Sequence, residues 1–298
     1  MKRASWIVRT GLLAGLLLCV GVPSVDAADA AYAGTDACKG CHEALAASFD
    51  KSFHAQAWAS TGKYQVAGCE ACHGPGGKHA ESNVKADIVS FGKGSTQSAE
   101  QRTAACLGCH ATSKELDFWG VGKHAGNGVA CADCHKVHAG AVPKVKQPDV
   151  CFDCHKDIRL EANKQSHHPI IEGKVSCSDC HNPHGSLAHG MVRADSRNQL
   201  CYKCHAEKRG PFAYEHPPVE EDCGTCHEAH GSRHDKLLTA RVPNLCQDCH
   251  SFEEHWGEAF DNNAGFAGSS PSSRFYARAC LNCHNLIHGS NGQADFRR

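Results

Sequence analysis

Methionine and the large aliphatic residues are scarce in this sequence. Methionine occurs twice in 298 residues, as Met1 and Met191. Leucine, isoleucine, valine and phenylalanine number 40 among residues 28–298, a share below the roughly 20% at which a chain struggles to build its own core. The formal net charge of −1 excludes a nucleic-acid binder held by bulk positive charge. Something other than aliphatic side chains must therefore fill the interior.

Long hydrophobic runs are missing except at the start of the chain. A basic start precedes an apolar run over 11–22, and small residues at 25–27 suit cleavage. We interpret residues 1–27 as a secretory signal, because the run is too short to span a bilayer as a helix. Residues 28–298 are then a single exported domain. Cys19 lies inside the run; a lipid-anchoring role is the alternative to an inert signal-peptide cysteine, although Leu18 fits the lipidation rule poorly.

Cysteine and histidine are abundant, with 21 and 23 copies. After the signal, every cysteine belongs to a Cys-x-x-Cys-His unit. This unit is the attachment signature of c-type haem: both thiols add to the vinyl groups of one porphyrin, and the adjacent histidine binds the iron. We therefore predict ten covalently bound haem c groups. The predicted thioether cysteines are Cys38, Cys41, Cys69, Cys72, Cys106, Cys109, Cys131, Cys134, Cys151, Cys154, Cys177, Cys180, Cys201, Cys204, Cys223, Cys226, Cys246, Cys249, Cys280 and Cys283. The predicted proximal iron ligands are His42, His73, His110, His135, His155, His181, His205, His227, His250 and His284.

Paired cysteines have two other common uses. An exported chain could join twenty cysteines in ten disulfides, and Cys-x-x-Cys pairs could bind five zinc ions. Neither explains why a histidine follows every second cysteine.

Thirteen histidines lie outside the units, and most of them follow the units at ordered spacings. In the units that begin at 131, 177 and 223, which are 46 residues apart, a second histidine comes three residues after the first. In most of the alternate units it comes 11–14 residues later, so the chain repeats in steps of two haems, five times. The predicted distal iron ligands are His54, His79, His124, His138, His168, His184, His216, His230, His255 and His288. The other three, His167, His189 and His234, are predicted to be surface residues.

The three-residue spacing has a geometric consequence. Two imidazoles on opposite faces of one iron put their Cα atoms roughly 12 Å apart, whereas three residues reach at most about 10–11 Å. We therefore expect His138, His184 and His230 to bind the haem of a different unit.

The ligand set indicates electron transfer rather than catalysis. Met/His ligation raises a haem potential, and one methionine after the signal allows it at one site at most. Ten His/His haems would be low in potential, low in spin and closed to substrate. The alternatives are a soluble periplasmic electron shuttle and, from another class, a multihaem oxidoreductase with an accessible iron that acts on a small nitrogen or sulfur oxyanion.

The expected fold is that of a multihaem c-type cytochrome, loop-rich with short α-helices, little or no sheet, and an elongated haem wire of five dihaem repeats. The longest helix is predicted over 42–60; the alternative is that its apolar residues only pack on haem. Loops are predicted at 74–77, 143–148, 217–218 and 262–279. We expect haem attachment and folding to be coupled. Lys144, Lys146, Lys203, Lys208 and Arg209 are candidates to neutralise haem propionates; simple solvated bases are the alternative.

Long segments around the units resemble one family. They are CEACHGPGGKH (69–79), FGKGST (91–96), ACADCHKVH (130–138), SHHPI (166–170), CSDCHNPHGS (177–186), CYKCHAEKRGP (201–211), EHPPV (215–219), CGTCHEAHGS (223–232) and CLNCHNLIHGSN (280–291). They are similar to segments of the periplasmic decahaem cytochromes of the MtrA, MtoA, PioA and DmsE group, from about Cys38 to Gly289. The segment ahead of Cys38 is shorter than in that group.

This resemblance implies bis-His ligation at all ten haems, with the ten distal ligands named above. It implies a wire threaded into an outer-membrane β-barrel porin, located in the periplasm and associated with the outer membrane. The implied partners are the porin, periplasmic or inner-membrane cytochromes and, in metal reducers, an extracellular multihaem cytochrome. Electrons flow outward for extracellular metal reduction and inward for iron oxidation. No nucleic-acid partner is implied.

Overall fold

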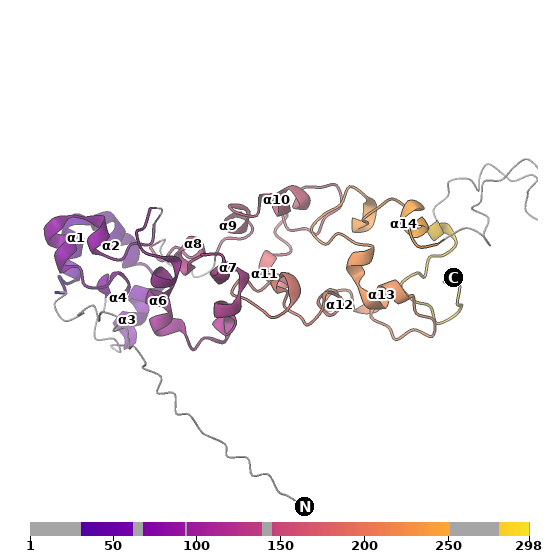
Figure 1. Ribbon diagram of the computed structural model, residues 1–298, viewed down its shortest axis with the longest axis horizontal. Coiled ribbons are helices and arrows are strands. Elements are labelled where there is room, and N and C mark those ends of the chain that lie inside the picture. The colour runs from indigo at the N-terminus through magenta and orange to yellow at the C-terminus, as the bar shows by residue number, and fades with distance from the viewer. Residues whose placement is uncertain (1–30, 62–67, 93, 139–144, 251–279, 298) are drawn as a thin grey trace, which may run out of the picture.

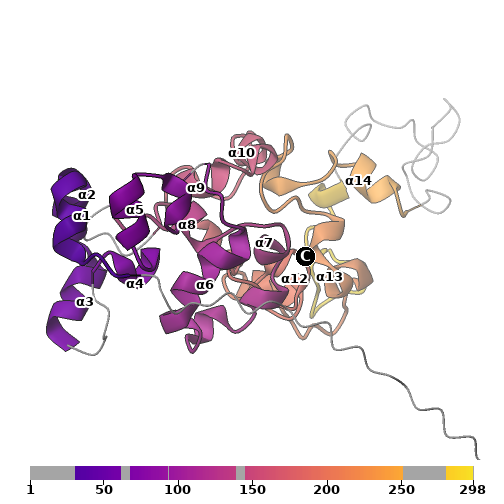
Figure 2. The same ribbon diagram turned by 60° about the vertical axis from the view of Figure 1, so that its left-hand side comes forward.

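A computed structural model describes residues 31–61, 68–92, 94–138, 145–250 and 280–297. They form an elongated rod with α1 (Thr35–Cys41) near one end and α14 (Asn244–Gln247) near the other, so that the chain runs broadly from end to end (Figure 1). In the turned view of Figure 2, α1 and α14 again lie at opposite ends of the described helices. The predicted signal at 1–27, the loop at 262–279 and the distal ligand His255 lie outside the described residues.

The regular structure consists of short helices. No strand forms in the described ranges. Four isolated antiparallel β-bridges occur there instead. The predicted loop-rich fold with short helices and little sheet is therefore confirmed. No described helix is long and apolar enough to cross a membrane. The α-helices between α1 and α14 are α2 (Glu43–Phe49), α3 (Phe53–Thr61), α4 (Glu70–His73), α5 (Gly77–Ser82), α6 (Ala99–His110), α7 (Lys123–Gly126), α8 (Cys131–Cys134), α9 (Asp149–Phe152), α10 (Lys156–Ala162), α11 (Cys177–Cys180), α12 (Arg197–Cys201) and α13 (Pro217–Glu221).

Two local predictions were wrong. The single long helix over 42–60 is two helices, α2 and α3, because Ser52 restarts the chain: its hydroxyl accepts a hydrogen bond from the amide of Ala55 at 3.2 Å. The longest described helix is instead α6, which begins with a capping box between Ser98 and Gln101. Residues 217–218, predicted as loop, open α13, where prolines suit a first turn that has no use for their missing N–H groups.

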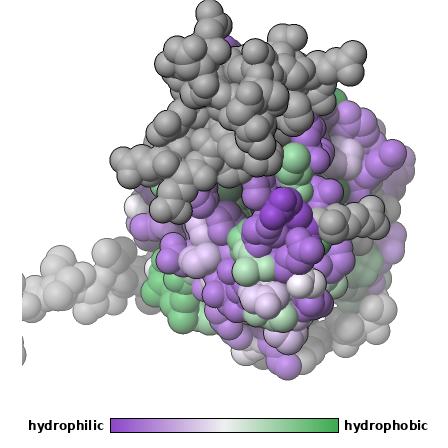
Figure 3. Space-filling view, turned by 90° about the vertical axis from the view of Figure 1, so that its right-hand side faces the viewer, coloured by the Kyte–Doolittle hydropathy of each residue, from purple (hydrophilic) through white to green (hydrophobic). Residues whose placement is uncertain are grey.

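The apolar core of the polypeptide is small. In the described ranges the buried hydrophobic residues are Ala130, Phe152, Ala162 and Ile170, and the last three form one cluster. Large apolar side chains remain exposed elsewhere, among them Leu187 at 81%. Where the end face nearest the C-terminus is visible in Figure 3, hydrophilic residues predominate and hydrophobic ones form separate patches. The polypeptide alone therefore buries too little apolar surface to explain a stable rod.

The 46-residue sequence repeat is also a structural repeat. His181 pairs with Val192 in an isolated bridge, and 46 residues later His227 pairs with Leu238 in the same way. Between each pair lies a 3-10 turn, at 189–191 and 235–237. Each turn contains a residue in the left-handed region, Gly190 in the first turn and Lys236 at the equivalent position of the second. Both repeats thus fold by the same local hydrogen bonds.

A buried carboxylate fixes the N-terminal end of the described chain. Glu70 is 6% exposed and accepts backbone hydrogen bonds from Ala33, Gly34 and Gly76 at 2.7–2.9 Å. Burial alone would raise the pKa of Glu70, but the three amide donors outweigh it and lower the pKa. This carboxylate therefore holds the segment at 31–34 on the second Cys-x-x-Cys-His unit.

Glu70→Ala should release this segment, because three buried amide donors lose their acceptor at a cost of about 2–4 kcal/mol. In the unchanged protein the contribution of Glu70 is complete above the unfolded pKa near 4.5 and is lost as the pH falls through the lower folded value. Hydrogen exchange at the amides of Ala33, Gly34 and Gly76 measures both effects. Glu81→Gln, at an exposed position of α5, is the control. Equal protection in Glu70→Ala and the control would contradict this role.

Candidate functional site

Each Cys-x-x-Cys-His unit forms about one helical turn. In nine of the units the backbone N–H of the histidine donates to the carbonyl of the first cysteine at 2.9–3.1 Å. This turn brings residues i, i+3 and i+4 to one side, so both thiols and the imidazole share a face. In α8 and α11 a carboxylate inside the unit caps the turn, as Asp133 accepts from the amide of Ala130 and Asp179 from that of Ser176.

The histidines predicted as proximal and distal ligands lie opposite one another in pairs. Every pair combines one histidine from a unit with one from outside the units, and no histidine appears twice. Ring centroids are 5.9–6.4 Å apart in the pairs His42–His79, His73–His138, His110–His54, His135–His184, His155–His124, His181–His230, His205–His168, His227–His288 and His250–His216. The tenth predicted pair would involve His255, outside the described residues.

No unit is paired with the outside histidine that follows it directly. His138 faces His73, and His184 faces His135, the histidine of the preceding 46-residue repeat. His230 likewise faces His181. Five units are paired with a histidine later in the chain, and four with an earlier one. The expectation that a three-residue spacing sends a histidine to a different unit agrees with this placement.

Backbone carbonyls hold many of these imidazoles by one nitrogen. The Nδ1 atom lies 2.5–3.0 Å from a carbonyl oxygen in seven of them. A donating Nδ1–H leaves Nε2 as the nitrogen with a lone pair, the form in which histidine binds a metal. These residues are His73, His79, His124, His168, His181, His227 and His284.

The three histidines predicted as surface residues lie outside the nine pairs. His167 has both nitrogens engaged, Nδ1 with the carbonyl of Lys164 and Nε2 with the carboxylate of Glu172 at 3.0 Å. This hydrogen bond to Glu172 raises the pKa of His167. His189 is exposed and His234 is partly exposed.

The thiols of successive units are neighbours. All twenty described cysteines are free of disulfides. The first cysteines of the two units in each repeat interact, as Cys106 does with Cys131. The same holds for the pairs Cys38–Cys69, Cys151–Cys177, Cys201–Cys223 and Cys246–Cys280.

The second cysteines connect one repeat to the next. Burial and then the charge of Cys109 raise the pKa of Cys72. The same electrostatic proximity relates Cys134 to Cys154, Cys180 to Cys204, and Cys226 to Cys249. The sulfur atoms of successive units thus lie close to one another. The ten units therefore form one unbranched series in sequence order.

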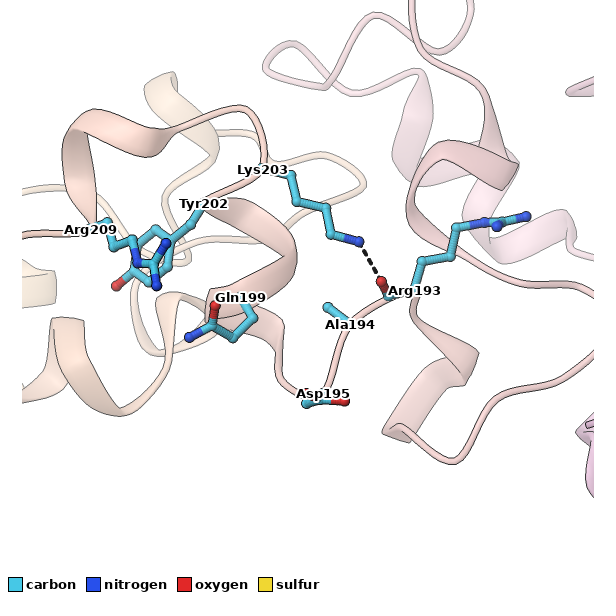
Figure 4. A pocket seen from close by; sticks show the side chains of 7 residues that line it. All are labelled: Arg193, Ala194, Asp195, Gln199, Tyr202, Lys203 and Arg209. Atoms are coloured by element: carbon cyan, nitrogen blue, oxygen red, sulfur yellow. Dashed lines mark hydrogen bonds between the residues drawn. The ribbon is translucent and has the colours of Figure 1, made fainter.

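A shallow basic depression lies beside the unit at 201–205. Its volume is about 470 Å³, and it is lined by Arg193, Ala194, Asp195, Gln199, Tyr202, Lys203 and Arg209 (Figure 4). Lys203 extends across it and donates to the carbonyl of Arg193. Two of the predicted propionate-neutralising bases, Lys203 and Arg209, thus lie together. Lys208 instead pairs with Glu207 and Lys146 with Asp149, and Lys144 lies outside the described residues. Arg193, eight residues before Cys201, was not predicted, because the sequence does not show that its segment folds back beside Lys203.

The donor chemistry fits covalently attached haem. Each unit presents two thiols and an imidazole on one face, and nine units have a second imidazole opposite. No group of three or more His, Cys, Asp and Glu that could hold a metal ion directly occurs among the described residues. The fold and this donor set together define a multihaem c-type cytochrome.

Comparisons with known proteins narrow this class. The doubled CXXCH motif profile matches residues 167–210 and 216–255, and the cytochrome c-type protein NrfB-like profile matches residues 69–144. The multiheme cytochrome MtrA of Shewanella baltica (strain OS185) is 41% identical over 264 residues, which cover 87% of this chain and 79% of that protein. The chain belongs to the MtrA family of multihaem cytochromes. It is an electron-transfer protein that carries covalently bound haem c.

Gly185 allows two segments of the site to approach closely. A side chain there would put a Cβ atom 2.3 Å from the carbonyl oxygen of Phe118, and its φ of +118° disfavours other residues. The same segment carries His184 and the Pro183 carbonyl that accepts from Nδ1 of His124. Gly185 therefore helps to place two of the paired imidazoles.

Gly185→Ala should destabilise the protein by about 2–4 kcal/mol, through overpacking and backbone strain. Thermal unfolding of the haem-loaded protein, followed by circular dichroism, measures the loss. Gly120→Ala is the control, since nothing lies within 4 Å of its added methyl group. Equal midpoints for the two variants would contradict the close approach.

Proposed function

We propose that this chain is a non-catalytic electron conduit with ten bis-His haem c groups in series, which carries electrons across the periplasm and outer membrane inside a β-barrel porin. The observation that carries the proposal is the set of nine imidazole pairs. With a metal–nitrogen bond of about 2 Å and a further ~1.2 Å to the ring centre, two imidazoles on one iron have centroids about 6.4 Å apart. The nine pairs lie at 5.9–6.4 Å.

In this proposal each unit histidine is the proximal ligand and the histidine opposite is the distal one. His284 and His255 form the tenth pair by elimination, and Nδ1 of His284 is already engaged by the carbonyl of Asp295 at 2.5 Å. All twenty cysteines of the units form thioethers. His167, His189 and His234 bind no iron.

The order of the thiols supports a conduit. The haems supply Fe(III)/Fe(II) centres between which electrons hop. The chain sets their sequence, because neighbouring thiols alternate between contacts within a repeat and contacts between repeats. The paired histidines would hold the iron from both sides and exclude substrate from it, which disfavours an oxidoreductase. Lys203, Arg193 and Arg209 would offset propionate charge near the seventh unit.

The setting of the conduit rests on the signal at 1–27 and on family membership. A narrow, loop-rich rod with a mainly polar end suits a polar barrel lumen (Figures 1 and 3). The proposed partners are a porin, periplasmic or inner-membrane cytochromes at one end, and an extracellular multihaem cytochrome at the other. The direction of flow follows from the donors and acceptors present, for metal reduction or iron oxidation. A soluble periplasmic shuttle is the second candidate, since the same rod would also diffuse freely.

His184→Met should raise the potential of one haem, because a thioether ligand favours Fe(II) more than an imidazole does. The affected haem should be the one attached at Cys131 and Cys134, whose histidine faces His184. A potentiometric titration of the haem absorbance measures the change. His189→Met, five residues further on and exposed, should leave the titration unchanged. An unchanged titration for His184→Met would overturn its distal role.

Gentle detergent extraction of outer membranes, followed by native electrophoresis with haem staining, tests the conduit itself. The expected result is a haem-stained band that contains a large β-barrel partner. Recovery of the cytochrome in the soluble periplasmic fraction alone would reject the porin and favour the shuttle.

A further inference from the structure

One distal histidine has a carboxylate beside Nδ1, where His79, His124 and His168 have a backbone carbonyl. Seven of the paired or unit histidines place Nδ1 on a backbone carbonyl. Nδ1 of His230 instead lies 3.3 Å from Oε2 of Glu161. A carboxylate is a charged acceptor, and hydrogen bonds to it are roughly twice as strong as those to neutral groups.

The position of Glu161 is fixed by its surroundings. Glu161 lies on α10. The residue that follows it in this helix, Ala162, is fully buried in the small core cluster. A Cβ atom on Gly231 would lie 2.0 Å from the backbone oxygen of Glu161, so the two backbones touch. Lys164 adds a second link, because its Nζ donates to the Gly231 carbonyl at 3.2 Å and lies 3.8 Å from Oε1 of Glu161. Helix α10 and the segment with His230 are therefore held together at this point.

The 46-residue repeat provides an internal comparison. Glu115, Glu161 and Glu207 occupy equivalent positions, and each interacts electrostatically with a distal histidine. Glu115 uses its Oε2 to accept from the hydroxyl of Ser113 at 2.7 Å. Glu207 lies 3.9 Å from Lys208. Of the three, Glu161 is the one with an ion-pair contact to its distal imidazole.

We propose that Glu161 is a positioning and tuning residue for the sixth haem. The negative charge of its carboxylate beside Nδ1 makes His230 a stronger electron donor to the iron opposite His181. Stronger donation stabilises Fe(III), so the haem attached at Cys177 and Cys180 has a lower potential than it would have with a carbonyl acceptor. The inference rests on the proposed function in one respect, that His230 is an iron ligand.

The lowered potential of the sixth haem lies inside the conduit rather than at its ends. The fourth and eighth haems, at the equivalent positions of the neighbouring repeats, have a carboxylate nearby but no such contact. The sixth haem should therefore titrate below them. Electrons passing along the series would cross one fixed local barrier near the middle of the rod, whichever direction they take.

The test compares four variants of the haem-loaded protein. In Glu161→Gln the charge is lost and the acceptor is weakened, and in Glu161→Asp the charge stays but the shorter side chain no longer reaches His230. Both should raise the potential of one haem and change one low-spin signal in the electron paramagnetic resonance spectrum. The first control, Asp157→Asn, removes another negative charge on α10 that influences His230 electrostatically but does not contact it. The second, Glu115→Gln, removes the equivalent carboxylate one repeat earlier. These two controls should shift a potential less and leave the spectral signals unchanged.

Unchanged potentials in both Glu161 variants would overturn the proposal. So would a shift in Asp157→Asn as large as in Glu161→Gln, because the effect would then be one of bulk charge. His230→Met separates this inference from the proposed function. If that variant leaves every haem with two imidazoles, His230 is not a ligand and the pairing itself fails. If it alters one haem while the Glu161 variants alter none, only the role of Glu161 fails.

Discussion

The structure depends on one constraint, that the two imidazoles of each pair come from different parts of the chain. A unit histidine is fixed by a helical turn, and the histidine opposite comes from a segment 31–65 residues away along the chain. In the proposed function each such pair is a crosslink through an iron. Nine interlocking crosslinks of this kind account for a defined rod in a chain with four buried hydrophobic residues in its described part. The paired histidines thus take the place of a larger apolar core.

The local hydrogen bonds serve the same constraint. Carbonyl acceptors at Nδ1 orient imidazoles on short helices, such as those of His73 and His124, as well as imidazoles on loops. Close backbone contacts, such as those of Gly185 with Phe118 and Gly231 with Glu161, bring separate segments near enough for their histidines to face a partner. The buried carboxylate of Glu70 likewise holds two separate segments together, because it binds the amides of Ala33 and Gly34 at the N-terminal end of the described chain. Short helices and turns are sufficient because the ligand pairs, and not helix packing, set the distances.

Much of this arrangement follows from the sequence. The ten units are complete within five residues each, so their chemistry requires no knowledge of the fold. The 46-residue spacing predicted a repeat, and the bridges at His181 and His227 repeat at that interval. The three-residue spacing was enough to predict that His184 faces another unit. It could not identify His135 as the partner, because that depends on the path of the chain between repeats. The break at Ser52 was missed because an alanine-rich segment with helical spacing conceals a capping serine, and Glu161 because it lies 69 residues from His230 in the sequence.

An experimental structure of the haem-loaded protein, at a resolution that defines the iron ligands, tests the pairing most directly. The account predicts an iron between the rings of each of the nine pairs, with His184 bound to the haem of Cys131 and Cys134. It also predicts His255 opposite His284. An iron with an open axial face, or His184 bound to the haem of its own unit at Cys177 and Cys180, would contradict it.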